Sequence, residues 1–353
     1  MTSVPRSTRQ PVRDPWPIDK LVRERAIALG FALDKSTHKA YASHLQSYIA
    51  FCDTHDFPLD PTPDTLSFYV VYMSHFIKPT SVDTYLSGIA SQLESFYPSV
   101  RDARKSALVT RYLAGCKKRF SAPKQRKRPI TVEDLLLVRS SVGLSPSHDD
   151  KLFVTLTYTG FFGLHRLGEL VWPDDRSLRT SRKLLRRRSV VVSDSTYGYD
   201  LPAHKADRYF AGSSVVIERR ADGLDPGAPF LAYLASRDSL FPFHPALFLL
   251  ADSSVPTRAW YLSRLQAVLG FSVAGHSLRP GGATFLASLG WPDAHLQAAG
   301  RWSSEAYKIY VREHPVLLQA SLQARRRAFD TCAAARQPSI SLTTSPPCHL
   351  PLQ

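Results

Sequence analysis

The sequence predicts a mainly α-helical protein with one small antiparallel β-sheet, an α+β fold divided between two domains. Apolar residues recur at helical spacing through most of the first 116 residues. Three short segments rich in Val, Tyr and Ile follow one another between residues 189 and 218, as strands of a small sheet would. The chain has 353 residues and is 44% hydrophobic, which is long enough for two domains and apolar enough for two cores.

The charge balance indicates a polyanionic partner. The chain carries 45 basic and 30 acidic residues, a formal net charge of +15, and an isoelectric point near 9.8. Nucleic acid is the simplest partner for such a chain, and the alternative is a basic protein that has no polyanionic partner.

Other features argue against several classes of protein. No run of 18 apolar residues predicts a transmembrane helix, so we expect no membrane partner. Residues 1–18 are polar and Pro-rich, lack the apolar region of a secretory signal, and are expected to be disordered. The cysteines form no CxxC pair, which argues against a zinc site or a disulfide framework and fits a reducing compartment. They are Cys52, Cys116, Cys332 and Cys348.

Residues 19–116 are expected to form a compact bundle of four or five helices. Helices are predicted near residues 21–29, 38–51 and 64–77, from residue 80 onward, and over 101–115. Thr80 to Asp83 resembles a capping box at the start of the fourth. This segment alone fits a DNA-binding domain and a helical domain without a ligand equally well.

A basic segment, residues 117–130, is predicted to link the two domains. Seven of the twelve residues from 117 to 128 are basic and none is acidic. Such a run can contact phosphates, act as a nuclear localisation signal or simply be solvated, and we expect contact with a polyanion. The residues concerned are Lys117, Lys118, Arg119, Lys124, Arg126, Lys127 and Arg128.

The second domain is predicted to span residues 131–330. Thr131 to Asp134 resembles a capping box, and a long apolar helix is expected over residues 149–163. Strands are expected at residues 189–192, 197–202 and 213–218, with Lys205 in the second turn. Helices at 228–236 and 258–269 follow. Residues 331–353 are poor in charge, rich in Ser, Thr and Pro, and expected to be disordered.

The stretch from Gly275 to Arg312 contains most of the side chains suited to chemistry. His276 and Arg279 are three residues apart at a predicted helix start, so they share one face. A short helix is expected after Pro292, and a last helix carries Tyr307 and Tyr310. Taken singly, these residues have ordinary explanations as ion-pair, packing or surface residues. Arg166, for example, has Glu169 three residues away as a partner for an ion pair.

In their order along the chain, these residues resemble a tyrosine recombinase, the phage-integrase type of enzyme that breaks and rejoins DNA. Within that superfamily the chain is most similar to the enzymes of Crypton-like transposons and related fungal genes. The resemblance covers residues 20 to 325 and lies in Arg166 before Gly168-Glu169-Leu170, a lysine in the hairpin turn, His-x-x-Arg, and a tyrosine ten residues after Gly300. It implies that the catalytic residues are Arg166, Lys205, His276, Arg279, Trp302 and Tyr310.

Two positions depart from the family pattern or leave a choice. The family usually has His or Trp directly after the glycine, but Arg301 occupies that place and Trp302 follows it. We take Trp302 as the equivalent, because an indole N–H can donate to a phosphate oxygen, although helix phase could favour Arg301. Tyr307 lies one helical turn before Tyr310 and faces the same way, and the spacing selects Tyr310 as the nucleophile.

The resemblance implies cleavage and rejoining of double-stranded DNA through a covalent 3′-phosphotyrosyl link, for site-specific recombination, integration or transposition. It also implies two domains that clamp the duplex, assembly as dimers to tetramers on DNA, and a nuclear location. No metal or other cofactor is implied, because arginines supply the charge. A domesticated DNA-binding protein that no longer cuts DNA and a related topoisomerase are the alternatives.

A second basic run, residues 176–188, is expected to contact backbone phosphates, and its alternative is a solvated edge of the sheet. The residues selected as DNA contacts are Arg182, Lys183, Arg186, Arg187 and Arg188.

Overall fold

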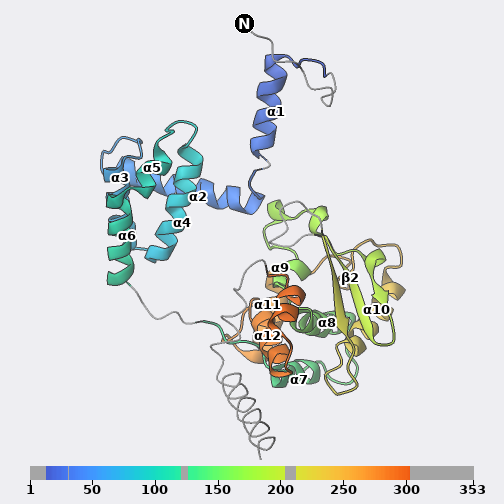
Figure 1. Cartoon of the computed structure of the whole chain (residues 1–353). Coiled ribbons are helices and arrows are strands. Elements are labelled where there is room, and N and C mark those ends of the chain that lie inside the picture. Colours follow the sequence, from blue (N-terminus) through green and yellow to red (C-terminus); the bar gives the residue numbers. More distant parts are fainter. Residues whose placement is uncertain (1–12, 31, 121–125, 203–211, 303–353) are drawn as a thin grey trace, which may run out of the picture. The chain divides into compact units, whose positions relative to one another are not determined.

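The computed structural model describes residues 13–30, 32–120, 126–202 and 212–302. The chain divides into two compact units, Met1–Gln125 and Arg126–Gln353 (Figure 1). Among the helices within those described ranges, none is both long and apolar enough to cross a membrane.

In the first unit, the five helices between residues 35 and 119 share one core. The helix α2 packs against α4, and α3 packs against α6. Buried aromatic and aliphatic side chains, such as Tyr48, Tyr69 and Ile89, fill the space between them. Thr62 begins α3 by accepting a hydrogen bond from Thr65 N at 3.2 Å. The helices are α1 (Ile18–Gly30), α2 (Lys35–Thr54), α3 (Pro63–Ser74), α4 (Pro79–Leu93), α5 (Val100–Lys105) and α6 (Ala107–Arg119).

Two local predictions in the first unit are wrong. The single helix expected over residues 101–115 is split at Ser106, whose extended backbone (ψ 152°) ends α5. The Ser106 hydroxyl then accepts from Val109 N, so one residue ends the first helix and caps the second. The capping box at Thr80 is also absent, because α4 already begins at Pro79.

The second unit combines helices with a small sheet, as predicted. The capping box predicted at Thr131 with Asp134 is formed, and the structure adds a second one, Ser147 with Asp150, at the start of the next helix. A helix also begins directly after Pro292, as expected. The elements are α7 (Val132–Ser140), α8 (His148–Phe162), α9 (Leu167–Leu170), the 3₁₀ turns η1 (Arg176–Leu178), η2 (Ser181–Lys183) and η3 (Arg187–Ser189), β1 (Val191–Val192), β2 (Thr196–Leu201), β3 (Ser213–Glu218), α10 (Gly227–Leu240), α11 (Arg258–Leu269), α12 (Leu278–Ser288) and α13 (Asp293–Ala299).

The three strands form one antiparallel sheet in the order β1-β2-β3. Its register places Tyr197 opposite Ile217 and Tyr199 opposite Val215. All four of these side chains are buried, so one face of β2 and β3 faces the core. This confirms the predicted fold class of a mainly helical chain with one small antiparallel sheet.

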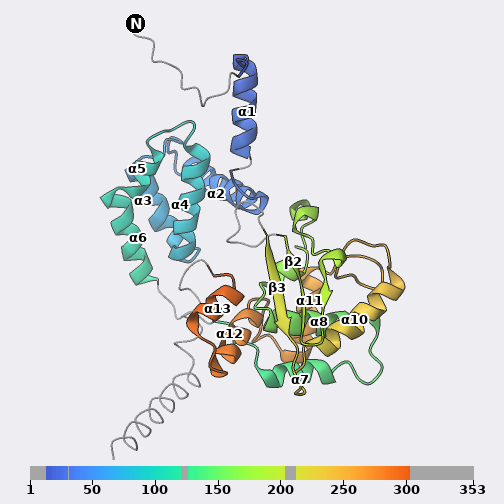
Figure 2. The same ribbon diagram turned by 45° about the vertical axis from the view of Figure 1, so that its right-hand side comes forward.

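The helix α8 is the central element of the second unit, as both views show (Figures 1 and 2). It contacts α7, α9, α10 and α12, and nearly all of its length is buried. The helix α12 approaches it closely because Gly282 has no side chain, since a Cβ there would collide with the carbonyl of Phe161. This close approach brings the start of α12, with Arg279, beside the C-terminal end of α8.

Candidate active site

The turn after α8 carries the first arginine of the candidate site. Leu164 N donates to Phe161 O at 3.3 Å, and His165 N donates to Gly160 O at 2.9 Å. This is the Schellman arrangement, in which the residue after the helix adopts a left-handed conformation. That residue is Leu164, with φ of 50°, rather than the usual glycine. The chain therefore reverses abruptly, and Arg166 becomes the residue that precedes α9.

Glu169, in α9, is the acceptor around which this turn is built. Its carboxylate accepts from Arg166 Nη1 at 3.1 Å, from Arg166 N at 3.2 Å and from His165 Nδ1 at 3.0 Å. A further donor, Arg301 Nη2, lies 3.4 Å away. The Glu169 side chain is only 6% exposed, whereas that of Arg166 is 34% exposed. The ion pair between Arg166 and Glu169 therefore exists, and it leaves part of the Arg166 side chain at the surface.

The protonation states follow from burial and from these hydrogen bonds. Burial alone would raise the pKa of Glu169, but the hydrogen bond from His165 and the charges of Arg301 and Arg279 outweigh it and give a pKa of about 2. Burial, with the same arginine charges, lowers the pKa of His165 to about 4. The neutral imidazole therefore donates through Nδ1 to the carboxylate, and its Nε2 accepts from the Tyr199 hydroxyl at 2.7 Å.

The start of α12 carries the second arginine. Arg279 is 5% exposed, and its Nη2 donates to the carbonyl of Gly300. Its guanidinium carbon lies 4.4 Å from the centre of the Trp302 ring, within the range of a cation–π contact. His276 is exposed and lies immediately before Ser277, which is fully buried and precedes α12.

The turn after α13 repeats the geometry of the turn after α8. Arg301 N donates to Ala298 O at 2.9 Å, and Trp302 N donates to Gln297 O at 3.1 Å. The left-handed residue is Arg301, with φ of 54°. Gly300 has no room for a side chain, because a Cβ there would collide with the Trp302 ring.

Three of the six predicted catalytic residues therefore belong to one connected cluster. Arg279 contacts Trp302 and binds Gly300, while Arg301 reaches the same Glu169 that pairs with Arg166. Lys205 and Tyr310, together with Tyr307, lie outside the described residues. Arg301, His165 and Tyr199 are the additional members that sequence reasoning did not select. The sequence carried a signal for two of them: Arg301 stands directly after the glycine, and His165 lies four residues before Glu169.

The cluster has the charge to hold an anion. The cluster contains three guanidinium groups and a single carboxylate, and only two of the three, Arg166 and Arg301, contact that carboxylate. His165 is neutral at pH 7 because its pKa is about 4. Arginine forks match the oxygens of a phosphate group, so the excess positive charge suits a phosphodiester. Within residues 13–30, 32–120, 126–202 and 212–302, no group of three or more His, Cys, Asp and Glu side chains is arranged to hold a metal ion.

No family model matches the chain, and no curated protein matches it by sequence. Solved structures do match. The integrase of the Tn1549 transposon, in complex with transposon right-end DNA, is 16% identical, with a TM-score of 0.53 over 88% of this chain and 98% of that one. A lambda integrase dimer bound to a COC' core site is 14% identical, with a TM-score of 0.50 over 83% of this chain and 76% of that one. The fold is that of the tyrosine recombinases.

A lambda integrase tetramer bound to a Holliday junction matches equally well, with 14% identity and a TM-score of 0.50 over the same shares of the two chains. At these identities the likeness establishes the tyrosine recombinase fold alone.

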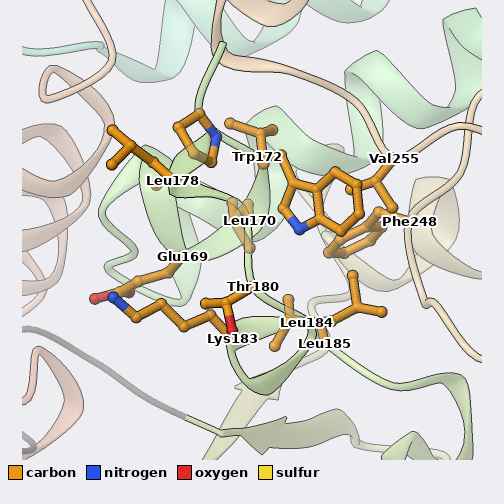
Figure 3. A pocket seen from close by; sticks show the side chains of 13 residues that line it. Glu169, Leu170, Trp172, Leu178, Thr180, Lys183, Leu184, Leu185, Phe248 and Val255 are labelled. Atoms are coloured by element: carbon orange, nitrogen blue, oxygen red, sulfur yellow. The ribbon is translucent and has the colours of Figure 1, made fainter. Parts of the chain in front are cut away.

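A small cavity lies behind α9 in this tyrosine recombinase fold. Its volume is about 40 Å³, and its lining includes Leu170, Trp172 and Phe248 (Figure 3). Such a volume holds a few water molecules at most, so it is not a substrate pocket.

Among the predicted DNA contacts, some are engaged within their own unit. Lys117, in the last turn of α6, donates to Asp83 at 2.8 Å. Arg128 pairs with Asp134 and Arg187 pairs with Asp238, at 2.9 and 2.7 Å respectively. Their assignment as DNA contacts stays a prediction. Lys124 lies outside the described residues, and the exposed ones are Lys118, Arg119, Arg126, Lys127, Arg182, Lys183, Arg186 and Arg188.

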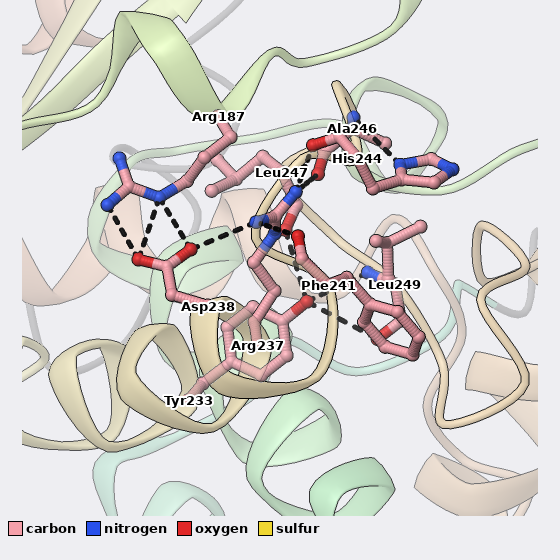
Figure 4. A network of polar contacts seen from close by, with 9 residues as sticks. All are labelled: Arg187, Tyr233, Arg237, Asp238, Phe241, His244, Ala246, Leu247 and Leu249. Atoms are coloured by element: carbon pink, nitrogen blue, oxygen red, sulfur yellow. Dashed lines mark hydrogen bonds and ion pairs between the residues drawn. The ribbon is translucent and has the colours of Figure 1, made fainter.

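A second arginine network surrounds Asp238, near the end of α10 (Figure 4). Arg237 is fully buried and donates to Asp238 at 2.9 Å and to Phe241 O at 2.7 Å. Its other terminal nitrogen donates to the carbonyls of His244 and Ala246. This network holds the loop after α10 in place.

Proposed function

We propose that this protein cleaves and rejoins DNA strands through a covalent 3′-phosphotyrosyl intermediate, with Tyr310 as the nucleophile. The reaction would serve site-specific recombination, integration or transposition. The observation that carries the proposal is the connected cluster of Arg166, Arg279 and Trp302, which come from three separate parts of a chain with the tyrosine recombinase fold.

The chemistry requires concentrated positive charge. Attack on a phosphodiester produces a crowded, doubly negative, five-coordinate transition state. Arg166 and Arg279 would bind its non-bridging oxygens, and the Trp302 indole N–H would donate to one of them. A tyrosine has an ordinary pKa near 10, and nearby guanidinium groups would favour its phenolate.

In the cleavage step one bond to phosphorus forms and one breaks. The Tyr310 oxygen forms a bond to phosphorus while the bond from phosphorus to the 5′-oxygen breaks. Lys205 would give a proton to the leaving 5′-oxygen. His276 would accept the phenol proton or bind a phosphate oxygen, and in the second case water takes the proton. Because the phosphotyrosyl bond keeps the bond energy, the 5′-hydroxyl of a second strand can reverse the step without ATP or a metal.

The partners follow from the same proposal. We infer that double-stranded DNA is the substrate, and the net charge of +15 supports this. The solved relatives are a dimer on a core site and a tetramer on a Holliday junction, which supports self-association on DNA. The resemblance to Crypton-type transposon enzymes and related fungal genes, together with the basic segment at residues 117–130, favours action in a nucleus.

The test is covalent trapping on a nicked suicide DNA substrate, with fragments from the flanks of the gene as first substrates. We expect the wild-type protein to form a protein–DNA adduct that survives SDS, and the Tyr310→Phe variant to form none. If only the Tyr307→Phe variant failed to form the adduct, Tyr307 rather than Tyr310 would be the nucleophile. Salt-sensitive binding without an adduct would favour a DNA-binding protein that does not cut, and relaxation of any supercoiled plasmid would favour a topoisomerase.

A further inference from the structure

Arg301 occupies the place where the family pattern has His or Trp, yet its side chain points back into the protein. It is 8% exposed, and its Nη1 donates to Ala299 O at 3.0 Å. Its Nη2 donates to Gly163 O at 3.2 Å and to Leu164 O at 3.3 Å. These donors are therefore used on the backbone, and Arg301 is poorly placed to bind a phosphate directly.

The acceptors of Arg301 are carbonyl groups at the ends of two helices. Gly163 and Leu164 follow α8, and Ala299 is the last residue of α13. The last carbonyls of a helix have no partner within the helix and carry its partial negative charge. One planar guanidinium thus stabilises both helix ends at once, which the compact ammonium of a lysine cannot do in the same way.

Arg301 also reaches the carboxylate that holds Arg166. Its Nη2 lies 3.4 Å from Glu169 Oε2, and the other oxygen of that carboxylate accepts from Arg166 Nη1 at 3.1 Å. Glu169 is therefore shared between an arginine at the surface and a buried arginine. On the other side of the same turn, Arg279 donates to Gly300 O.

The backbone of Arg301 supports a role for its side chain. Three helices of the second unit, α8, α12 and α13, end with the same hydrogen-bond pattern and a left-handed residue. After α12 this residue is Gly290, with φ of 84°, which adopts the conformation without strain. A residue with a Cβ costs about 1–2 kcal/mol more in that conformation. The contacts of the Arg301 guanidinium offset this strain at the turn that carries Trp302.

We propose that Arg301 is a positioning residue for the reaction, which fixes the turn of Arg166 and the turn of Trp302 relative to each other through Glu169 and the Gly163 and Leu164 carbonyls. This inference rests on the proposed function. It assigns to Arg301 a role distinct from contact with the phosphate. Small displacements of groups that bind a transition state reduce the rate strongly, while substrate affinity, set by many phosphate contacts, changes little.

The test compares Arg301→Lys with the wild-type protein in single-turnover cleavage of the suicide substrate at saturating DNA. The lysine keeps the charge but reaches fewer acceptors. We expect adduct formation to slow by about tenfold to a hundredfold, because misplaced groups lose that much of the rate. The dissociation constant for DNA should stay within about twofold, since no phosphate contact is lost.

The same substitution made in the Arg166→Lys protein distinguishes a positioning role of Arg301 from direct binding of the phosphate. If Arg301 acts through Arg166, then Arg301→Lys should slow the Arg166→Lys protein by no more than about threefold, because coupled groups are not additive. Equal losses in both backgrounds would overturn the proposal, as would weaker DNA binding that matches the loss in rate. A wild-type rate in Arg301→Lys would overturn it as well.

Arg301→Gly and Arg264→Lys complete the set. Glycine suits the left-handed backbone, so Arg301→Gly removes the guanidinium while retaining the turn, and it should slow adduct formation at least as much as the lysine does. Arg264 pairs with Asp150 in the first turn of α8, the end opposite the candidate site, and its lysine variant should cleave at the wild-type rate. Absence of an adduct from the wild-type protein would instead contradict the proposed function itself.

Discussion

The networks around Glu169 and Asp238 contain the same chemical groups but differ in their exposure to solvent. Each is a carboxylate in the second unit that binds two arginines. The Glu169 side chain is 6% exposed and that of Asp238 is 37% exposed. In the first network the partly exposed partner is Arg166, a predicted catalytic residue, whereas in the second it is Arg187. Similar ion pairs can therefore support a candidate active site or only a loop.

The difference lies in what each network holds. Arg237 gives most of its donors to backbone carbonyls of residues 241–246, so its contribution is local stability (Figure 4). Glu169 joins a turn near residue 165 to a turn near residue 301. Its ion-pair partner Arg301 is 132 residues away in the sequence. Water also screens Asp238 far more than Glu169. Burial and sequence separation, rather than the number of ion pairs, distinguish the candidate active site.

The largest effect is expected from Glu169→Gln. This change leaves Arg301 buried without its carboxylate, and breaking a buried pair in this way costs about 3–5 kcal/mol. We expect the free energy of unfolding, measured by urea denaturation, to fall by about that amount, and adduct formation to be lost. A decrease below about 1 kcal/mol would mean that the pair is effectively solvent-screened.

The next effect is a pH dependence from His165. Its pKa falls from 6.5 to about 4 on folding, so the unfolded chain binds a proton first as the pH drops. The stability that neutral His165 contributes to the folded state is fully present above pH 6.5 and is lost between about pH 6.5 and 4. The stability that ionised Glu169 contributes is lost at lower pH, as the pH falls from 4.5 toward its pKa of about 2. The urea midpoint should decline over the first window.

His165→Gln is the matched control for this decline. Its amide can accept from Tyr199 and donate to Glu169 but does not titrate. The slope between pH 6.5 and 4 should therefore largely disappear in the variant, and a slope equal to that of the wild-type protein would assign it to other groups.

A smaller effect is expected from Asp238→Asn. The hydrogen bond from Arg187, with that from Arg237 and the two arginine charges, holds the pKa of Asp238 below its usual value. The side chain is nevertheless partly exposed, and Arg237 keeps its carbonyl acceptors. We expect the free energy of unfolding to fall by about 1 kcal/mol, with no change in adduct formation. A loss larger than that of Glu169→Gln would reverse the comparison between the two networks.

The smallest effect concerns salt. A double-mutant cycle between Arg187 and Asp238 should give a coupling of about 0.2–1 kcal/mol, as is usual for pairs in contact with water. This coupling should shrink in 1 M NaCl, where charges are screened within about 3 Å. A coupling between Arg301 and Glu169 should persist at that salt concentration, because both side chains are buried. Equal salt sensitivity would show that the two sites are equally hydrated.

The sequence determined the local structure of this protein. Thr131 with Asp134 and the Pro292 start predicted helix ends that the structure confirms, because capping depends on residues a few positions apart. The three strands and the mainly helical class followed from periodicity for the same reason. Two local patterns failed: the helix predicted to begin at Thr80 begins at Pro79, and the single helix predicted over residues 101–115 is divided by Ser106.

Only the tertiary structure decided which charged groups meet. Arg301 and Trp302 are neighbours in the sequence, yet one binds carbonyls 137 and 138 residues away and the other stacks on Arg279. Arg128 and Arg187 belong to basic runs, yet each binds a carboxylate of its own unit. Charge and spacing in a sequence give the composition of a site. The packing of distant helix ends, here allowed by glycines such as Gly282, decides which donor reaches which acceptor.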